Sequence, residues 1–151
     1  MGPAQVQPQA GKSPRILVAE DDFEMRRLVS DCLRKEGYDV SEVADGSALL
    51  LSIDDPLQRA PAVVDLLVTD IRMPMFTGLE IVSGLREAGV QMPVVIMTAF
   101  GNAETRKRAE ALGAKLLNKP FKMDELRGLV RSLLPAASRG NQRTPDDGSA
   151  L

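Results

Sequence analysis

Histidine is absent from the sequence, and cysteine occurs once, as Cys32. The absence of histidine excludes Ser-His-Asp and Cys-His catalysis, HExxH zinc sites and the formation of a phosphohistidine on this chain. Any reaction that needs a histidine must therefore draw it from another protein. With one cysteine the chain forms no internal disulfide. Cys32 falls on the apolar side of a predicted helix, where we expect a small buried hydrophobic residue.

Aromatic residues, excess charge and long apolar runs are also scarce. Aromatics make up 3% of the chain and the formal net charge is −2, so the core must be aliphatic and no basic surplus favours nucleic acid or an anionic membrane. No run approaches the ~18–20 apolar residues that span a bilayer. The first residues, MGPAQVQPQAGKSP, lack the hydrophobic region of a secretory signal. We therefore expect a cytoplasmic protein.

The remaining composition, 44% hydrophobic and 26% charged, is typical of a globular domain. Residues 1–13 are rich in Pro, Gln and Gly, and residues 135–151 are small, polar and proline-containing. Neither segment has enough apolar surface to offset the entropy lost on ordering, so we predict that both are disordered. Residues 14–134 are predicted to form one compact domain.

Inside this domain, short aliphatic runs alternate with helical patterns. The runs predict strands at residues 15–19, 38–43, 63–69, 93–98 and 115–118. One face of the first helix collects apolar residues at helical spacing, namely Met25, Leu28, Val29, Cys32 and Leu33. Three later helices are opened by Asp45, by a Thr77–Glu80 capping box and by Asn102. The fifth helix stops at Pro135.

Strands that alternate with helices pair in parallel through right-handed crossovers, so that helices cover both faces of the sheet. The nearly continuous apolar strands agree, because strands buried on both faces need no alternation. In such sheets, ligands bind at the carboxyl ends of the strands. The residues at those ends are therefore the first candidates for a functional site.

Carboxylates, a hydroxyl and a lysine occupy the predicted strand ends. In chain order they are Glu20, Asp21, Asp70, Thr98 and Lys119. Unpaired carboxylates close together repel one another, and a hard divalent cation removes that repulsion. Mg²⁺ suits oxygen ligands of this kind, whereas a transition-metal site is disfavoured without histidine or a second cysteine.

A carboxylate in such a cluster can act as a nucleophile toward phosphorus and form an aspartyl phosphate. The transferring phosphoryl group spreads negative charge over its oxygens, and a metal ion, a lysine and hydroxyl or N–H donors stabilise that charge. The strand ends supply all of these groups and no base that would activate an external nucleophile. Every element of a phosphoryl-accepting site is present.

Five motifs over residues 14–134 resemble those of response-regulator receiver domains, in order and with family-like spacing. They are ILVAEDDFEMRRLV, EGYDVSEVADGSALL, LLVTDIRMPMFTGLEI, PVVIMTAFG and LGAKLLNKPFKMDEL. The chain is similar to the chemotaxis receiver, and more so to the single-domain receivers of sporulation-type phosphorelays. The resemblance implies an α/β, flavodoxin-like, doubly wound (βα)5 fold with a five-stranded parallel sheet of strand order 2-1-3-4-5.

The resemblance also implies a role for each acidic residue at the strand ends. Asp70 would be the phosphoryl acceptor. Asp70 and Asp21 would bind Mg²⁺ directly, Arg72 would offer the metal its backbone carbonyl, and Glu20 would hold the ion through water. Asp22 falls one place past the acidic pair. Mg²⁺ is thus the expected cofactor.

Further roles and one departure lie on the last two strands. Thr98 would bond a phosphoryl oxygen and move inward on activation, with Ala99 keeping that approach clear. Lys119 would neutralise the phosphoryl charge, and its bond to Pro120 is usually cis in this family. Leu116 stands where the family usually has Tyr, Phe or His, three residues before the lysine. Leucine lacks the two-position ring, so the mode of switching stays open.

Two other features depart from the family or modify its chemistry. The connection Asp54–Ala62 is longer than usual and lies far from the acceptor edge, where it is a candidate partner contact. Arg72 and Phe100 sit where side chains crowd the water that attacks an aspartyl phosphate. We hypothesise slow self-dephosphorylation.

The leading interpretation is a stand-alone phosphoacceptor of a two-component or phosphorelay system. Its expected partner is a sensor histidine kinase or histidine phosphotransfer protein, and its only catalysis is its own phosphorylation and slow autodephosphorylation. The residues after 135 are too few for a DNA-binding or enzymatic output domain. Output would then pass through the face formed by the fourth helix, fifth strand and fifth helix, or by onward phosphotransfer.

Two other classes of function compete with this interpretation. The first is a docking module that acts without phosphorylation, which Leu116 leaves open. The second is an aspartate-based phosphatase, which needs a second acid shortly after the nucleophile, where this chain has Arg72. The sequence identifies neither the cognate kinase and pathway nor the downstream target or oligomeric state.

Overall fold

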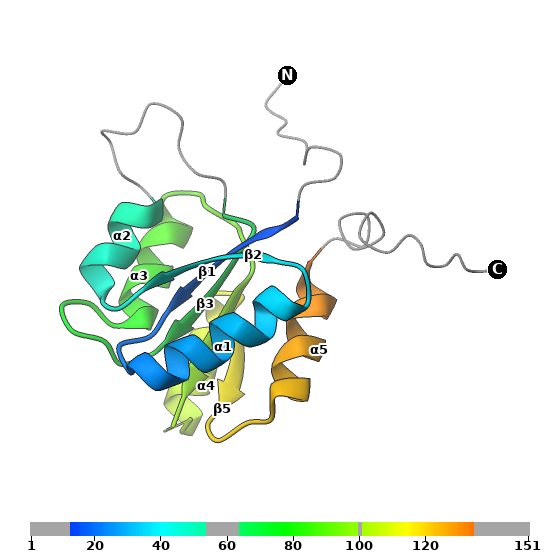
Figure 1. Cartoon of the computed structure of the whole chain (residues 1–151). Helices are drawn as coiled ribbons and strands as arrows, with labels where there is room; N and C mark the ends of the chain where they lie inside the picture. The colour runs from blue at the N-terminus through cyan, green and yellow to red at the C-terminus, as the bar shows by residue number, and fades with distance from the viewer. Residues whose placement is uncertain (1–12, 54–63, 100, 135–151) are drawn as a thin grey trace.

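Five short strands pair in parallel in the order β2-β1-β3-β4-β5 (Figure 1). They are β1 (Arg15–Ala19), β2 (Asp39–Val43), β3 (Leu66–Asp70), β4 (Val94–Thr98) and β5 (Lys115–Asn118). The computed structural model describes residues 13–53, 64–99 and 101–134. The predicted N-terminal tail except Ser13, the predicted C-terminal tail, the whole Asp54–Ala62 connection and Phe100 lie outside the described residues.

A helix follows each strand along the chain, which confirms the predicted doubly wound fold. The helices are α1 (Phe23–Lys35), α2 (Gly46–Ile53), α3 (Gly78–Glu87), α4 (Ala103–Ala111) and α5 (Met123–Leu133). The strand bounds agree with the prediction within a residue except at β3, which begins at Leu66 instead of residue 63. No helix within the described ranges has the length and apolar character needed to cross a membrane.

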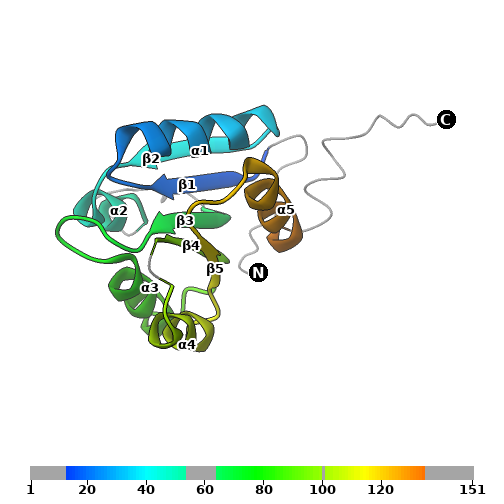
Figure 2. The same ribbon diagram turned by 90° about the horizontal axis from the view of Figure 1, so that it is seen from below.

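Two apolar clusters lie on opposite faces of the sheet. Ile16 and Val18 of β1 point toward α1 and α5, whereas Leu17 and Ala19 point toward α2, α3 and α4. Figure 2 shows the two helical layers on either side of the strands. Cys32 is buried in the first cluster, as predicted. Each fully buried aliphatic side chain contributes about 1.5–3 kcal/mol relative to an exposed one, so the layers hold the strand ends in fixed relative positions.

The predicted caps begin three of the helices. Thr77 Oγ1 accepts the Glu80 N–H at 3.1 Å, and Glu80 Oε1 accepts the Thr77 N–H at 2.9 Å, which completes the capping box of α3. Asn102 Oδ1 caps α4 at 2.8 Å, and Asp45 Oδ1 accepts an N–H of α2 at 2.8 Å. Each cap satisfies a backbone donor that has no partner inside its helix.

Arg86 joins the carboxyl end of α3 to the carboxyl end of α4. Its Nε donates to the Leu112 carbonyl at 2.8 Å, and its Nη1 donates to the carbonyls of Val90 and Met92 at 2.9 Å each. Burial lowers the pKa of Arg86. The helix α4 buries one residue, Ala109, and its charged side chains are exposed, and Arg86 attaches the end of this helix through the Leu112 carbonyl.

Candidate functional site

The carboxylates of Glu20, Asp21 and Asp70 meet at the carboxyl edge of the sheet. One oxygen from each lies within 4.8 Å of the others. Glu20 follows β1 and is buried, Asp70 is the last residue of β3 and is buried, and Asp21 is exposed. The cluster therefore has two acids held inside the protein and one that faces solvent.

Lys119 lies between the two buried carboxylates. Its Nζ is 3.0 Å from Glu20 Oε1 and 3.1 Å from Asp70 Oδ1, and the side chains of the two acids are 1% and 9% exposed. Burial by itself would lower the pKa of the Lys119 ammonium, but the contacts with Glu20 and Asp70 outweigh burial and raise it. The lysine is thus fully charged where it touches the acids.

The surroundings of Glu20 act on the charge of its carboxyl group in both directions. Burial raises the pKa of its carboxyl group, and the charge of Asp70 raises it further. The Asp22 N–H, which donates to Glu20 Oε2 at 3.1 Å, and the Lys119 ammonium act in the opposite direction. A further cation at this edge would relieve the repulsion that remains between the acids.

The oxygen donors at this edge fit a hard divalent cation. Mg²⁺ typically takes one or two carboxylates together with retained water and phosphate oxygens, so two of the three acids suffice as direct ligands and the exposed side of the cluster leaves room for water. No nitrogen or sulfur ligand belongs to this group of described residues. The donor set therefore agrees with the predicted Mg²⁺ and not with a transition metal.

The backbone around Asp70 is fixed from three directions. Thr69 Oγ1 donates to the Asp70 carbonyl at 2.9 Å, and the Ile71 N–H donates to the Met97 carbonyl of β4 at 3.0 Å. The Gly78 N–H at the start of α3 donates to the Ile71 carbonyl at 3.0 Å. A Cβ atom on Gly78 would lie 2.5 Å from the Asp70 carbonyl oxygen, so only glycine allows this close approach.

The main chains of Thr98 and Lys119 are joined at the end of β4. The Lys119 N–H donates to the Thr98 carbonyl at 2.7 Å, and the Thr98 side chain is fully buried. The Lys119–Pro120 peptide bond is cis, as the resemblance implied. Ala99, directly after the strand, is exposed. Thr98 is thus brought to the same edge as the lysine.

The remaining predicted residues lie farther along the loops or strands. Arg72 has an exposed side chain and lies two positions after Asp70, in the segment leading to α3. Leu116 of β5 is half-buried and packs against the cluster beneath α2, α3 and α4. Phe100 lies outside the described residues, so its place relative to Arg72 stays a prediction.

Two residues near the acids had no predicted role. Asp22 is the N-cap of α1, because its Oδ1 accepts the N–H groups of Glu24 and Met25 at 3.0 and 3.3 Å. An aspartate directly before an amphipathic helix is a recognisable capping signal. Arg26 donates from Nη1 to the Glu20 carbonyl at 2.8 Å, and no pattern in the sequence distinguishes it from its neighbour Arg27.

Comparison with known proteins places these features in one family. The sequence model of the response regulator receiver domain matches residues 16–131. The chain is similar to sporulation initiation phosphotransferase F of Bacillus subtilis, with 32% identity over 125 residues, 82% of this chain and 96% of that protein. It is 35% identical over 124 residues to the response regulator receiver protein CpdR of Brucella abortus, covering 82% and 98% of the two chains.

Other relatives are longer. The transcriptional regulatory protein CpxR of Escherichia coli is 33% identical over 134 residues, and the match covers 88% of this chain but 54% of that protein. Among solved structures, the receiver domain of the Francisella response regulator 1452 has a TM-score of 0.73 at 29% identity, covering 80% of this chain and 96% of that one. Chemotaxis response regulator CheY4 of Vibrio cholerae has a TM-score of 0.71 at 28% identity, covering 82% and 100%.

Proposed function

The chain belongs to the response regulator receiver domain family, and from this we propose that Asp70 accepts a phosphoryl group from a histidine of a partner protein in a Mg²⁺-dependent reaction. Receiver domains are signalling domains of two-component systems and interact with histidine kinases or phosphotransfer proteins. The lack of histidine in this chain agrees with a donor on the partner. The protein would catalyse its own phosphorylation and slow autodephosphorylation, and not the turnover of a separate substrate.

One observation carries the proposal: a charged lysine touches two buried carboxylates at the edge where ligands of such sheets bind. Lys119 Nζ lies 3.0 and 3.1 Å from Glu20 and Asp70, and Asp21 completes the acidic cluster from the solvent side. A solitary buried pair would need no third acid. The excess negative charge of the three acids would bind a divalent cation. That cation would in turn offset the negative charge of an incoming phosphoryl group.

In the proposed step, a carboxylate oxygen of Asp70 attacks phosphorus as the bond from phosphorus to the partner's imidazole nitrogen breaks. The nitrogen keeps the electron pair of that bond and takes up a proton, and Asp70 becomes an acyl phosphate. Lys119 neutralises charge on the phosphoryl oxygens, and the Thr98 hydroxyl donates a hydrogen bond to one of them.

The metal in this proposal would be held by Asp21 and Asp70, by Glu20 through water and by the backbone carbonyl of Arg72. When bound, Mg²⁺ supplies positive charge that offsets the repulsion between the acids and the phosphoryl oxygens. The acids themselves orient the ion at the edge of the sheet. The burial of Glu20 and Asp70 limits access of water to the reacting carboxylate of Asp70.

We propose that phosphorylation of Asp70 is signalled to a downstream protein through the exposed face of α4, β5 and α5, or that the phosphoryl group is passed on to a histidine of another protein. The exposed charges of α4 and its single buried residue leave that face available. A second candidate function, docking without phosphorylation, is favoured by Leu116, which is half-buried against the cluster beneath α2, α3 and α4 and has no aromatic ring to move between two positions. An aspartate-based phosphatase is disfavoured by Arg72 where such enzymes need an acid.

The deciding experiment is to incubate the protein with Mg²⁺ and acetyl phosphate and to measure its intact mass. We expect a gain of one phosphoryl group that is stable in acid and labile in base. The Asp70→Asn variant should gain none. The Asp39→Asn variant, altered at the start of β2 on the opposite edge of the sheet, should gain as much as the unmodified protein.

The alternatives give different outcomes in the same assay. A docking module would show no mass gain with or without Mg²⁺. A phosphatase would release inorganic phosphate repeatedly and leave the protein mass unchanged. A mass gain that persists in Asp70→Asn would place the acceptor elsewhere and contradict the proposal.

A further inference from the structure

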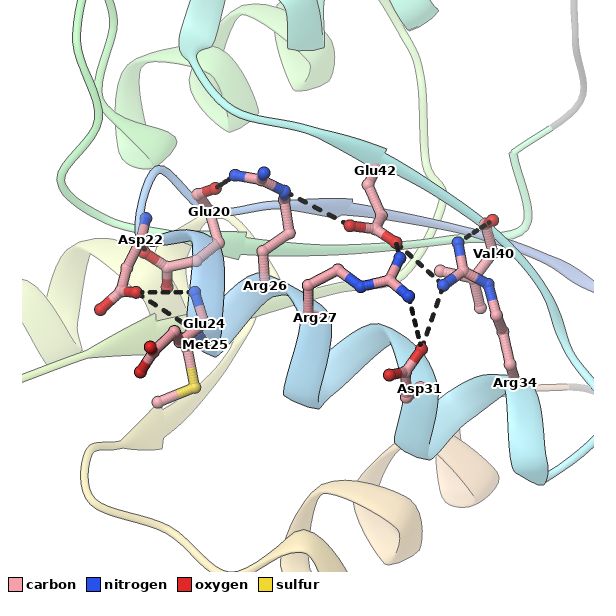
Figure 3. Close-up of polar contacts among 10 residues, drawn as sticks. All are labelled: Glu20, Asp22, Glu24, Met25, Arg26, Arg27, Asp31, Arg34, Val40 and Glu42. Atoms are coloured by element: carbon pink, nitrogen blue, oxygen red, sulfur yellow. Dashed lines mark hydrogen bonds and ion pairs between the residues drawn. The ribbon is translucent and has the colours of Figure 1, made fainter.

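Arg26 connects β2 to the backbone that carries the acidic residues (Figure 3). Its Nη1 donates to the Glu20 main-chain carbonyl at 2.8 Å, and its Nε lies 3.3 Å from Glu42 Oε1 on β2. The side chains of Arg26 and Glu42 are 15% and 14% exposed, and the guanidinium lies 5.3 Å from the centre of the Phe23 ring. One guanidinium thus joins two elements at a largely enclosed point.

Glu42 pairs with two other arginines, but these point away from the acidic cluster. Arg27 and Arg34 both approach Glu42 Oε2 at 2.9 Å and both also pair with Asp31 on the outer side of α1 (Figure 3). Their side chains are 47% and 37% exposed, and ion pairs at that exposure contribute little to stability. Arg26 is the member of the three that bonds to Glu20.

The contact of Arg26 acts on the peptide unit between Glu20 and Asp21. The carbonyl of Glu20 and the N–H of Asp21 share one rigid plane, so holding the carbonyl also orients the start of Asp21. The other side of Glu20 is held by its own N–H, which donates to the Val43 carbonyl of β2 at 3.1 Å. The position of both acids is therefore set from β2, at Val43 and through Glu42 and Arg26.

We propose that Arg26, oriented by Glu42, is a positioning residue for the divalent-cation site of Glu20, Asp21 and Asp70. This inference rests on the proposed function, because it assumes that the acids bind Mg²⁺. Residues that orient metal ligands are needed for full affinity even though they do not touch the ion. Arg26 fills that part through the main chain, since its guanidinium bonds to a carbonyl and not to a ligand carboxylate.

The sign of the effect separates positioning from simple electrostatics. A guanidinium near an acidic cluster repels a cation, so removal of its charge alone would strengthen Mg²⁺ binding. Loss of positioning would weaken it. Changes to Glu42 do not distinguish positioning from electrostatics. Removing the negative charge of Glu42 would weaken Mg²⁺ binding by loss of attraction, and it would also weaken binding by leaving Arg26 unoriented.

Arg27 offers a matched control for Arg26. It lies next to Arg26 on α1, pairs with the same Glu42 carboxylate and carries the same charge, but it makes no contact with Glu20 among those found in the described residues. The test is a Mg²⁺ titration of the full chain followed by the backbone amide signals of residues 20–22 in ¹H–¹⁵N NMR spectra. The same spectra show whether each variant is folded.

We expect Arg26→Gln to weaken Mg²⁺ binding about tenfold, and Arg27→Gln to leave it within about twofold. Arg26→Lys keeps the charge but cannot span Glu20 and Glu42 with a planar fork, so it should also bind Mg²⁺ more weakly. This variant keeps the inference testable if Arg26→Gln does not fold.

Two results would overturn the inference: Mg²⁺ binding by the Arg26 variants that equals or exceeds that of the unmodified protein, or equal losses in the Arg26 and Arg27 variants. Failure of the proposed function looks different. In that case the unmodified protein itself would show no Mg²⁺-dependent shifts at residues 20–22, and no phosphoryl group would be gained from acetyl phosphate.

Discussion

Replacing Lys119 by methionine tests the charge balance of the acidic cluster. Methionine keeps most of the apolar stem but leaves the carboxylates of Glu20 and Asp70, 1% and 9% exposed, without the ammonium that now lies 3.0 and 3.1 Å away. Removing one partner of a buried ion pair costs about 3–5 kcal/mol. The lysine side chain is 21% exposed, so we take the lower end of that range and expect a loss of about 3 kcal/mol in metal-free buffer.

Mg²⁺ should restore most of this loss, because the ion neutralises the same carboxylates. A ligand present at about 100 times its dissociation constant stabilises the folded state by about 2.7 kcal/mol, close to the expected deficit. The chain has no tryptophan, so urea unfolding is best followed by far-ultraviolet circular dichroism, with EDTA and with saturating Mg²⁺. Lys107→Met, on the exposed face of α4, is the matched control and should change stability by less than about 0.5 kcal/mol.

The reasoning fails if Lys119→Met and Lys107→Met unfold at the same urea concentration in EDTA. It also fails if Mg²⁺ stabilises Lys119→Met no more than it stabilises the unmodified protein. Phosphorylation by acetyl phosphate should stay slow in Lys119→Met even when Mg²⁺ has restored its stability, because the charge that meets the phosphoryl oxygens is still missing.

Four further changes probe the fold and the chemistry. Arg86→Met, which leaves three main-chain carbonyls without their shared donor, should lower the free energy of unfolding by about 2–3 kcal/mol; a loss no larger than that of an exposed α4 arginine would contradict this. Gly78→Ala should cost about 1–3 kcal/mol and slow phosphorylation, because its Cβ would lie 2.5 Å from the Asp70 carbonyl oxygen. Gly84→Ala, in open space on α3, should stabilise the protein in the same denaturation assay. Replacing both Arg72 and Phe100 by small or acidic residues should speed decay of the aspartyl phosphate measured by intact mass, and an unchanged decay rate would refute the crowding hypothesis.

The sequence predicted most of the fold because its signals are local and periodic. The capping box of Thr77 and Glu80 and the cap at Asn102 need only residues a turn apart, and the structure has both. The start of β3 was misplaced because a run of apolar residues does not show where backbone hydrogen bonding to the neighbouring strands begins. Asp65, inside the predicted strand, donates its N–H to the Arg15 carbonyl at 2.8 Å but accepts the Arg15 N–H with its carboxylate at 2.8 Å, ahead of the first β3 residue.

The acidic cluster followed from one rule, that parallel strands bring their carboxyl ends to one edge. This rule placed Asp70 and Lys119 near Glu20, although Asp70 follows Glu20 by 50 positions and Lys119 follows it by 99. It could not supply the contacts that refine the site. The close approach of Gly78 to the Asp70 carbonyl depends on the path of the loop between β3 and α3, which no periodic pattern encodes.

Arg26 was beyond prediction for a more specific reason, which is that strand register decides its partners. The pairing of β1 with β2 sets Val18 opposite Glu42, and this places the Glu42 carboxylate within reach of the guanidinium that also bonds to the Glu20 carbonyl. A shift of one residue in that register would turn Glu42 to the other face of the sheet. The arginines of α1 would then lose their common partner, and the backbone before Asp21 would lose its attachment through Arg26. The precision of the acidic site therefore depends on the pairing of an edge strand that contributes no residue to the cluster itself.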